Sequence, residues 1–437
     1  MATLADVEDM LKEVWPATFE TIFSNEIVTL TRIESTNRDV FSKMSARYAY
    51  VPIRVGRTQA IGSATVGVSG TGETAAWPEP DSQKWDRAQV QLVKQWGTAD
   101  ISVDAMKLVD SDPRAFINAL DQELQGLQED LLYDYSRQIH GTPSGRLCSG
   151  SGTVTDNGDG TYLVAVSDIQ YVEKGMRLDA YGGTLAALEA GTLTKANPTG
   201  WFLITAIGTS PKTITVAHTG GLSGLLVTGT TYHFRRKLNG GGSYLSDLAG
   251  FGYLVDDGTT YPSVQGLSSA SLPAWRSPKI TVSPAGPYTE RVVVQACNAT
   301  RREVGAAPSV FFTGLGGRTA IFEVMRSYRQ INDSLDLGGG FTGLPFSYGG
   351  KNIPIVEDPR FPEEADASTG AGKLLGLNEN DITLYQEGEG WHFADEGGSM
   401  FFPATDRSDK YEMRMRKYSQ CAITRRNSHC YITGFNL

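Results

Sequence analysis

The most constraining feature of the sequence is a long amphipathic segment at residues 112–140. Asp112 is a residue type common at helix N-caps, and Pro113 suits the first helical position. Apolar side chains then recur at three- and four-residue spacing, at Ile117, Leu120, Leu124, Leu127, Leu131 and Tyr135. Acidic side chains lie off that stripe, at Glu123, Glu129 and Asp130. Gly141 can end the segment. The pattern predicts one long helix that lies on a surface with one face buried.

Residues 47–100 have a different character, with two β runs around a tip rich in glycine, serine and threonine. The tip, from Gly62 to Pro80, has too few large apolar residues to form a core. The returning strand, from Ala88 to Val103, alternates apolar and polar residues. A long hairpin that cannot bury itself is either disordered or lies on another molecule. We therefore expect an extended hairpin that serves as an arm between molecules.

Between residues 149 and 240 the sequence changes to short β runs separated by turn dipeptides such as Asn157-Gly158 and Asp159-Gly160. A glycine-rich linker at 238–244 follows. The pattern predicts a compact small barrel inserted into its host and folding as a module. Its expected apolar set is Val164, Val166, Leu178, Trp201, Leu203, Ile204, Ile214 and Val216.

The remaining segments predict an N-terminal arm and a mixed α/β region. The arm, residues 1–46, begins with a short helix and continues as a β-branched stretch. The apolar face of that helix is Leu4, Val7, Leu11 and Val14. Further on we expect a helix at 287–304, a strand in "PSVFFTG", a helix in "RTAIFEVMRSYRQI" and a short proline-broken strand in "YGGKNIPIVEDPRFP". Strands close the chain at 410–436, where Tyr411, Met413 and Met415 alternate with charged residues.

Composition narrows the class of protein. A formal net charge of −10 argues against a protein that grips nucleic acid through a basic surface. No apolar run reaches the roughly 18 to 20 residues that cross a bilayer, so we expect no membrane partner. Four scattered cysteines fit reduced thiols in a cytosolic compartment better than a disulfide framework. The 49 glycines indicate many turns and bulges.

Enzyme-like motifs are weak throughout. The glycines of "FFTGLGGRTA" (Gly314, Gly316 and Gly317) fit neither a dinucleotide-binding loop nor a P-loop, so a tight turn is favoured. The "DNGDG" string at 156–160 lacks the spaced ligands of a calcium loop and reads as a hairpin turn. His140 is expected near the negative end of the long helix, and His429 beside Cys430 is expected to pack rather than bind metal. The acidic cluster Glu363, Glu364 and Asp366 reads as a solvated loop. We predict no enzyme, no cofactor and no metal.

One basic stretch stands out in this acidic chain, at Arg414, Arg416, Lys417, Arg425 and Arg426. These residues could contact DNA, or pair with acidic hairpin residues of a second molecule. We favour the second interpretation because the chain as a whole is acidic.

The order of these parts resembles the tailed-phage major capsid proteins of the Hong Kong 97-like (HK-97) fold. "DPRAFINALDQELQGLQEDLLYDYSRQIHG" is similar to their spine helix, and "FFTGLGGRTAIFEVMRSY" to a strand and helix of their axial domain. The string "YGGKNIPIVEDPRFP" resembles a family turn, here with Tyr348, Gly349, Gly350, Pro354 and Asp358. "SYLSDLAGFGYLVDD" is also similar. The resemblance covers nearly the whole chain, and the 149–240 block resembles the insertion domains of some members.

The resemblance implies an α+β fold with an N-arm, an extended loop, a peripheral domain with the spine helix, an axial domain and an inserted β-barrel. The expected segments are 1–46 (N-arm), 47–100 (extended loop), 101–148 (peripheral domain), 149–240 (barrel), 241–409 (axial domain and remaining peripheral parts) and 410–437 (closing strands). We expect the assembly interface to include Gly62, Gly70, Trp77, Trp85, Arg414 and Arg416.

The implied function is a structural subunit of an icosahedral phage head, which assembles with itself into hexamers and pentamers around double-stranded DNA without sequence specificity. The implied partners are a portal protein, a separate scaffolding protein and a possible decoration protein. The implied location is the virion, after assembly in the host bacterial cytoplasm. Because little chain precedes the hairpin, we also expect the mature subunit to begin at Met1 or Ala2. The alternatives are another β-rich phage protein (tail tube, baseplate or decoration) or an encapsulin-like shell.

Overall fold

The structure is a computed structural model, and its described residues form two compact units. The structure describes residues 28–36, 38–41, 48–61, 79–102, 113–197, 199–237, 245–325, 335–336, 342–363, 370–388, 390–393, 401–403 and 410–437. Among these, Trp96–Tyr133 and Phe393–Arg416 belong to the first unit, and the others to the second. The predicted helix near the N-terminus and the hairpin tip lie outside the described residues, apart from the last two residues of the tip, Glu79 and Pro80.

The first unit contains most of helix α4 (Pro113–His140), up to Tyr133, and the helix begins at the proline predicted to start it. Leu127 and Leu131 are half-buried, whereas Glu129 and Asp130 are exposed, so the predicted helix and its described face are confirmed. Strand β4 (Val93–Ser102) meets the helix at Gly97, where an added Cβ would lie 2.9 Å from the Leu127 and Leu131 methyl groups.

The same unit holds the predicted alternation near the C-terminus. Strand β21 (Phe401–Pro403) pairs antiparallel with β22 (Lys410–Ile423), and Phe401 lies opposite Met413. Met413 and Met415 are buried, at 2% and 1% exposure, while the charged residues that alternate with them, Glu412, Arg414 and Arg416, are half-exposed. Period-two burial of this kind is what a strand with one buried face requires. Beyond Arg416, β22 continues into the second unit, and β20 (His392–Phe393) is a short strand of the same sheet.

The second unit contains a seven-stranded mixed sheet in the order β13-β23-β18-β14-β17-β16-β15. Its strands are β13 (Lys279–Gly286), β14 (Val310–Thr313), β15 (Leu335–Asp336), β16 (Thr342–Tyr348), β17 (Lys351–Glu357), β18 (Gly370–Leu377) and β23 (Cys430–Phe435). Neighbouring residues of one strand face opposite cores: Phe311 packs in one cluster, and Phe312 in another. Both faces of this sheet are therefore buried.

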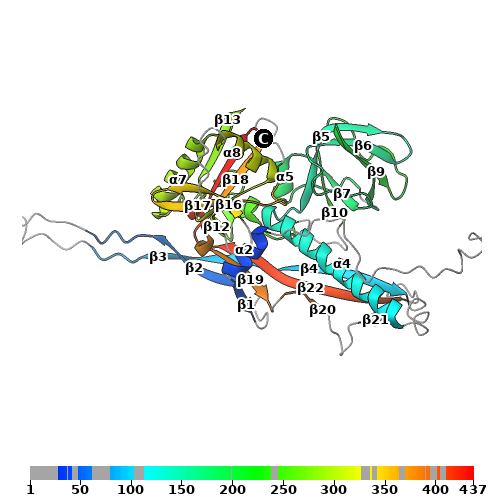
Figure 1. Ribbon diagram of the computed structural model, residues 1–437, viewed down its shortest axis with the longest axis horizontal. Helices are drawn as coiled ribbons and strands as arrows, with labels where there is room; N and C mark the ends of the chain where they lie inside the picture. Colours follow the sequence, from blue (N-terminus) through cyan, green and yellow to red (C-terminus); the bar gives the residue numbers. More distant parts are fainter. Residues whose placement is uncertain are drawn as a thin grey trace, which may run out of the picture. The chain divides into compact units, whose positions relative to one another are not determined.

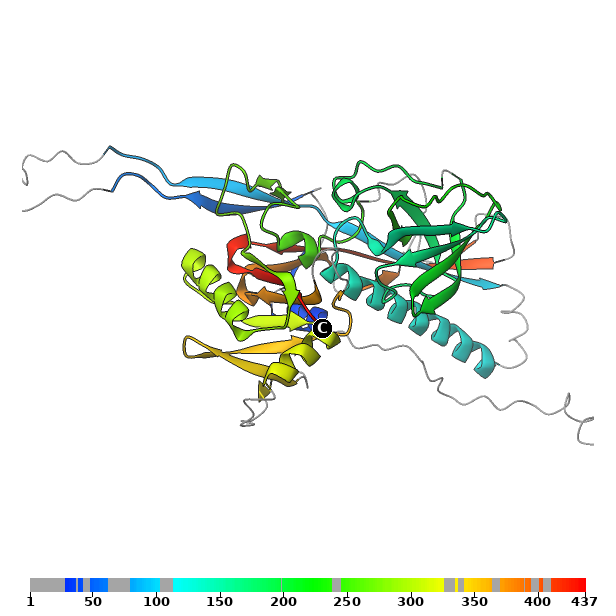
Figure 2. The ribbon, with the colours of Figure 1, turned by 90° about the horizontal axis from the view of Figure 1, so that it is seen from above.

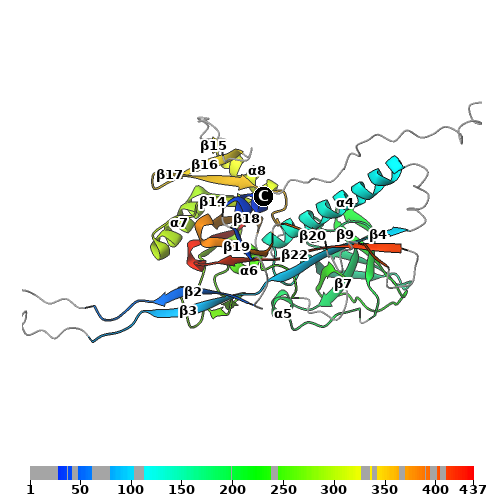
Figure 3. The same ribbon diagram turned by 90° about the horizontal axis from the view of Figure 1, so that it is seen from below.

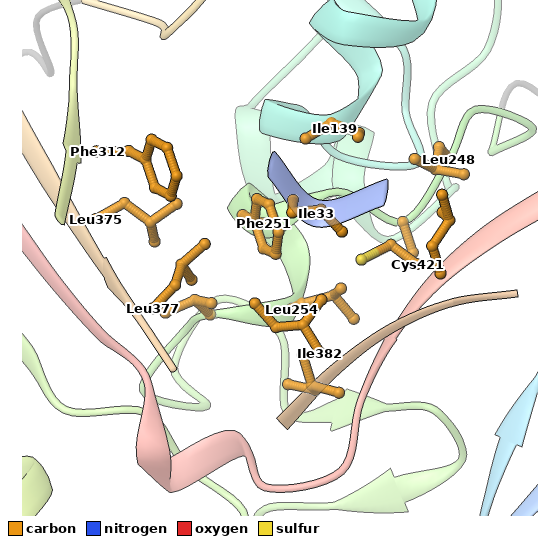
Figure 4. Packing of buried hydrophobic residues seen from close by; sticks show 14 of the residues in the cluster. Ile33, Ile139, Leu248, Phe251, Leu254, Phe312, Leu375, Leu377, Ile382 and Cys421 are labelled. Atoms are coloured by element: carbon orange, nitrogen blue, oxygen red, sulfur yellow. The ribbon is translucent and has the colours of Figure 1, made fainter. Parts of the chain in front are cut away.

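One face of the sheet carries α7 (Glu290–Val304) and α8 (Leu315–Met325), as Figure 3 shows for α7. The predicted helix at 287–304 is confirmed, although it begins three residues later. On the opposite face lie α6 (Phe251–Leu254) and the buried end of α4, and Figure 4 shows Phe251, Ile139 and Phe312 in that cluster. Gly250 allows this packing, because a Cβ there would lie 2.2 Å from the Gln138 carbonyl oxygen.

The β-branched stretch after the N-terminal segment folds as a helix, α2 (Val28–Thr36). Val28, Leu30 and Ile33 are at most 3% exposed. They belong to the buried cluster that also holds Phe251 and Leu254 of α6, which we call the α6 cluster. Burial of this face overrides the weak helix propensity of β-branched residues. Strand β1 (Arg38–Phe41) follows and pairs in parallel with β19 (Ile382–Glu387), which pairs with the second-unit part of β22.

The barrel is closed, with the strand order β10-β5-β6-β9-β8-β7 (teal to green in Figure 1). Its strands are β5 (Arg146–Asp156), β6 (Thr161–Val166), β7 (Arg177–Gly182), β8 (Phe202–Thr209), β9 (Lys212–His218) and β10 (Tyr232–Arg236), with helix α5 (Leu185–Glu189). The prediction that Trp201 and Leu203 lie in the core is wrong: both are half-exposed, and Phe202 and Ile204 point inward. The continuous apolar run "WFLITAI" does not reveal which alternate positions face inward.

The hairpin consists of β2 (Ala49–Gly56) and β3 (Lys84–Val90), which pair antiparallel and form the extended blue ribbon in Figure 2. The predicted returning strand, Ala88 to Val103, is not one strand. It breaks at residues 91–92, because β3 pairs with β2 whereas β4 pairs with β22. Two short strands, β11 (Ser263–Val264) and β12 (Leu267–Ser268), lie against the hairpin base, where the Gln89 amide donates to the Gln265 carbonyl.

The "YGG" string forms the turn of a second hairpin, between β16 and β17. Gly349 and Gly350 have φ values of +58° and +80°, which glycine adopts without strain. Pro354 does not break β17, contrary to expectation, and lies opposite Pro345 inside the paired region. The strand ends at Glu357, just before the Asp358-Pro359 step. Two 3₁₀ turns, Glu379–Asp381 and Arg426–Ser428, complete the regular elements of the described chain.

Candidate assembly interface

The hairpin carries an exposed face of aromatic and cationic side chains. Pairing places Tyr50 opposite Gln89, Pro52 opposite Arg87, and Arg54 opposite Trp85. We call the exposed members of this row the hairpin face: Tyr50, Pro52, Arg54, Trp85 and Arg87. Tyr50 is 57% exposed and Trp85 is 63% exposed, high values for large aromatic side chains.

The described part of the hairpin packs against its own subunit on one side, where Val51 and Ile53 lie against the buried cluster that holds Phe251. Ala88 and Val90 are buried, at 1% and 2% exposure, whereas every residue from Lys84 to Arg87 is exposed. Ile61, at the last described position before the tip, is 77% exposed. Within the described hairpin, β2 therefore touches a core as far as Ile53, whereas the facing part of β3, Lys84–Arg87, is exposed.

The six predicted interface residues divide into three groups. Gly62, Gly70 and Trp77 lie outside the described residues. Trp85 lies on the hairpin face in the second unit. Arg414 and Arg416 lie on β22 in the first unit, so these three are not brought together within one unit. Arg414 is already engaged by its own strand, with its guanidinium 2.8 Å from Glu412 and 5.0 Å from the centre of the Phe402 ring.

Two of the five residues of the basic stretch are buried, so the predicted contact with DNA or with a neighbour is limited to the other three. Arg426 is fully buried, and its guanidinium donates to the carbonyl oxygens of Leu254, Tyr261 and Trp275. Lys417 is 3% exposed, and its ammonium lies 4.4 Å from the centre of the Tyr135 ring. These two side chains are unavailable to DNA or to a neighbour. Charge alone could not separate them from the exposed Arg425.

A buried carboxylate, Asp358, joins three elements of the second unit. The Thr29 amide donates to Asp358 Oδ2 at 3.1 Å, and His140 Nε2 lies 3.0 Å from the same oxygen. The Arg360 amide donates to Oδ1 at 2.8 Å. Burial alone would raise the pKa of the carboxyl, but the His140 charge and these hydrogen bonds outweigh it and hold the pKa below its usual value. His140 was expected at the helix end, but its partner was not foreseen.

A second buried ionic cluster fastens the barrel to α4. Asp247 accepts from Arg137 of α4 at 2.7 Å and from Arg235 of β10 at 3.2 Å. Arg137 also donates to Asp134 at 3.0 Å. Burial opposes ionisation of Asp134, but the charges of Arg137 and Arg236 outweigh it and lower its pKa to about 2. Sequence reasoning missed this cluster, although Arg137 sits two residues from the buried stripe position Tyr135.

The barrel also contacts the turn that follows β17. The Gln170 side-chain amide donates to the Pro359 carbonyl at 2.8 Å, and the Tyr171 hydroxyl donates to the Arg360 carbonyl. At another point Thr142 and Ser144 each donate to Glu189 Oε1 at 3.0 Å. The barrel is therefore held by side chains at several points, beyond its two chain connections.

The enzyme-like motifs have structural roles in the described chain. Glu363 is not part of a solvated loop, since its carboxylate accepts from the Gly317 amide at 2.8 Å and so occupies the start of α8. The "DNGDG" string forms the β5–β6 turn, with Asp159 accepting from the Thr161 amide at 2.9 Å. Buried His429 accepts from the Asn378 amide at 3.2 Å, and burial lowers its pKa to about 3.

The four cysteines, Cys148, Cys297, Cys421 and Cys430, are free and buried. Burial raises the pKa of the Cys297 and Cys421 thiols to about 12, so both are unreactive at neutral pH. Among the described residues, no cluster of three or more histidine, cysteine or acidic side chains could hold a metal ion. No helix in the described part of the chain is long and apolar enough to cross a membrane.

Comparison with solved structures shows which fold the chain has. A structure of the cyanophage A-1(L) capsid asymmetric unit matches with a TM-score of 0.51, 12% identity and coverage of 98% of both chains. The SrpI encapsulin of Synechococcus elongatus PCC 7942 matches with a TM-score of 0.48, 7% identity and coverage of 100% of this chain and 96% of the other. A capsid of an empty GTA particle matches with a TM-score of 0.45, 10% identity and coverage of 100% of this chain and 99% of the other.

No family model matches the sequence, and no curated protein matches it. The end-to-end likeness to the cyanophage chain, at 12% identity, shows the fold alone. The chain has a capsid-protein fold of mixed α and β structure, as the order of its sequence elements predicted.

Proposed function

We propose that the chain is the structural subunit of an icosahedral phage head, which assembles into hexamers and pentamers around double-stranded DNA. The observation that carries the proposal is the hairpin face on a chain with a capsid-protein fold throughout. A two-stranded ribbon is at best marginally stable by itself in water. Exposed tyrosine, tryptophan and arginine are the residues most enriched at the centres of protein interfaces.

Assembly would bury the aromatic side chains that the hairpin face exposes to water. A second subunit that covers Tyr50 and Trp85 would bury the aromatic surface that this subunit leaves in water, and burial of apolar surface contributes about 25 cal/mol per Å². A closed shell repeats such a contact around every symmetry axis, so each contact can be modest. The role is structural, and the charges of buried Asp358 and Arg426 and of half-buried Asp247 serve the fold.

The finer organisation belongs to the same proposal. We assign 1–46 to an N-arm, 47–100 to the extended loop, 101–148 and 410–437 to the peripheral domain, 149–240 to an inserted barrel, and 241–409 to the axial domain with remaining peripheral parts. A separate scaffolding protein, a portal and a possible decoration protein would be its partners. The subunits would assemble in the host cytoplasm and reside in the virion.

Sedimentation and negative-stain electron microscopy of the purified full-length chain, alone and with proteins from a phage lysate, test the proposal. We expect hollow closed particles, and nuclease-protected double-stranded DNA in particles from lysates. If only monomers, dimers or open tubes form under all of these conditions, the proposed function is wrong.

A further inference from the structure

A groove lies beside the hairpin, within the second unit, with a volume of about 440 Å³. One wall is the chain from Ile53 to Arg57, and another is the loop from Ser271 to Trp275. The last two residues of α7, Glu303 and Val304, and the segment around Arg425 complete it. The volume is in the range of about 300–1,000 Å³ that small-molecule sites have.

A bulge in β2 brings two arginines to this groove. The pairing of β2 with β3 shifts register between Arg54 and Gly56, which makes Val55 an extra residue. Residues three apart point to opposite faces of a regular strand, but an extra residue reverses the alternation. Arg54 and Arg57 therefore both line the groove. Bulges re-aim side chains in this way next to many functional sites.

The groove concentrates positive charge on a chain whose formal net charge is −10. Among the described residues, no carboxylate lies within ion-pair distance of Arg54 or Arg57. Arg425 adds a third guanidinium to the lining, with Asp381 at 3.6 Å. Guanidinium groups present paired N–H donors that match the oxygens of a phosphate. Three of them in one groove favour a ligand that carries several phosphates.

The end of α7 gives another part of the groove the opposite polarity. The helix ends at Val304, and the last carbonyl oxygens of a helix have no partner within it and form the negative end of its dipole. Glu303 is the one carboxylate in the groove lining. The apolar side chains of Ile53, Leu272 and Val304 also line the groove and are half-buried. A fitting ligand therefore has an anionic part, an apolar part and hydrogen-bond donors.

We propose that this groove binds a nucleoside triphosphate whose base carries an amino group, such as ATP. Its phosphates pair with Arg54, Arg57 and Arg425. Its base packs against the apolar side chains and donates from its amino group to the carbonyl oxygens at the end of α7. The bound nucleotide joins the hairpin to α7 and to the loop 271–275. This binding is a property of the single subunit and does not rest on the proposed function.

Titration calorimetry of the unassembled full-length subunit with Mg²⁺-free ATP tests the proposal. We expect saturable binding, and tripolyphosphate should bind at least about tenfold more weakly because it has no base to bury against the apolar side chains. Equal affinity for ATP and tripolyphosphate would overturn the nucleoside assignment. Adenosine that binds as tightly as ATP would overturn the role of the arginines. Absence of saturable ATP binding would overturn the proposal as a whole.

Two arginine variants separate the groove from the general charge of the surface. Arg57→Ala should weaken ATP binding at least about tenfold, because a guanidinium–phosphate pair is lost. Arg291→Ala is the matched control, since Arg291 is exposed in the first turn of α7, about 18 Å along the helix from Glu303. That separation exceeds the screening length of about 8 Å, so ATP affinity should stay within about twofold. Equal losses in the two variants would overturn the site.

Hydrogen exchange of the unmodified subunit gives a second measurement, which does not depend on the folding of any variant. ATP should slow the exchange of amides in 53–57 and 271–275, the two walls of the groove. The amides of the barrel strands β6 and β9 serve as the internal control and should not change. Unchanged exchange in both walls at saturating ATP would place the nucleotide elsewhere and overturn the proposal.

Discussion

The barrel and the hairpin are both built from antiparallel strands, yet only the barrel encloses a core of its own apolar side chains. The barrel closes on itself, so each of its six strands has two neighbours. Its interior holds Tyr162, Phe202 and Phe234, all 0% exposed. The hairpin has two strands and no interior, and Trp85 is 63% exposed.

The contrast shows that strand pairing alone does not determine whether a β segment is stable. Backbone hydrogen bonds form in both regions, but only the barrel also removes large apolar side chains from water. We therefore expect the free energy that holds the outer hairpin to come from another molecule. The barrel is the region we expect to withstand separation from its surroundings, and the hairpin is the region we expect to depend on assembly.

The largest expected effect concerns the barrel core. Phe202→Ala removes a fully buried ring that packs against Tyr162 at 5.7 Å between ring centres, and should lower the free energy of unfolding by about 3–5 kcal/mol. Leu163→Ala, on the outer side of barrel strand β6 at 40% exposure, should cost under about 1 kcal/mol. Urea unfolding of both variants measures the difference. Equal costs would mean that the barrel core does not stabilise the region.

Acid should lower the free energy of unfolding of the folded subunit through protonation of His429, which is buried, whereas the exposed hairpin contributes nothing to this effect. Its folded pKa is about 3, below the value of about 6.5 for an unfolded chain, so the unfolded state binds one more proton between these pH values. Stability should therefore fall as pH is lowered through that window, by about 1.4 kcal/mol per pH unit from this residue. His429→Gln should remove that part of the slope in unfolding measured from pH 6 to pH 4. Parallel curves for the two proteins would contradict the assignment.

The smallest effect on stability, and the most informative about assembly, is expected on the hairpin face. Trp85→Ala should change the free energy of unfolding of the free subunit by no more than about 0.5 kcal/mol, because the ring contacts little of its own chain. Particle yield by sedimentation should nevertheless fall strongly. Lys84→Ala, at the neighbouring exposed position, is the matched control and should assemble normally. If Trp85→Ala assembles as well as the control, the hairpin face is not an interface.

Sequence reasoning predicted the elements whose signals are local. The α4 helix has a start residue and an apolar stripe over several turns, and the "DNGDG" and "YGG" turns have glycines where φ is positive. Buried and half-exposed residues alternate along β22 as expected, because one face of the strand is buried. In each case neighbouring residues carry the whole signal.

Features set by distant residues could not be predicted in the same way. The burial of Arg426 depends on carbonyls that lie about 150 or more positions away in the chain. Val28–Thr36 has a strand-like composition but is helical because the α6 cluster buries it. Trp201 and Phe202 are adjacent apolar residues, and only barrel closure decides which points inward. For the candidate interface, the sequence located the hairpin, while the register of β2 and β3 was needed to define its exposed face.

Hydrogen exchange of the free subunit and of the assembled particle compares the two regions most directly. We expect the amides of the barrel strands β6 and β9 to be protected in both states, because their pairing and core belong to one chain. The amides of the outer hairpin, Arg54 and Lys84–Arg87, should exchange fast in the subunit and slowly in the particle. Equal protection of the outer hairpin in both states would contradict the claim that it gains its stability from a neighbouring subunit.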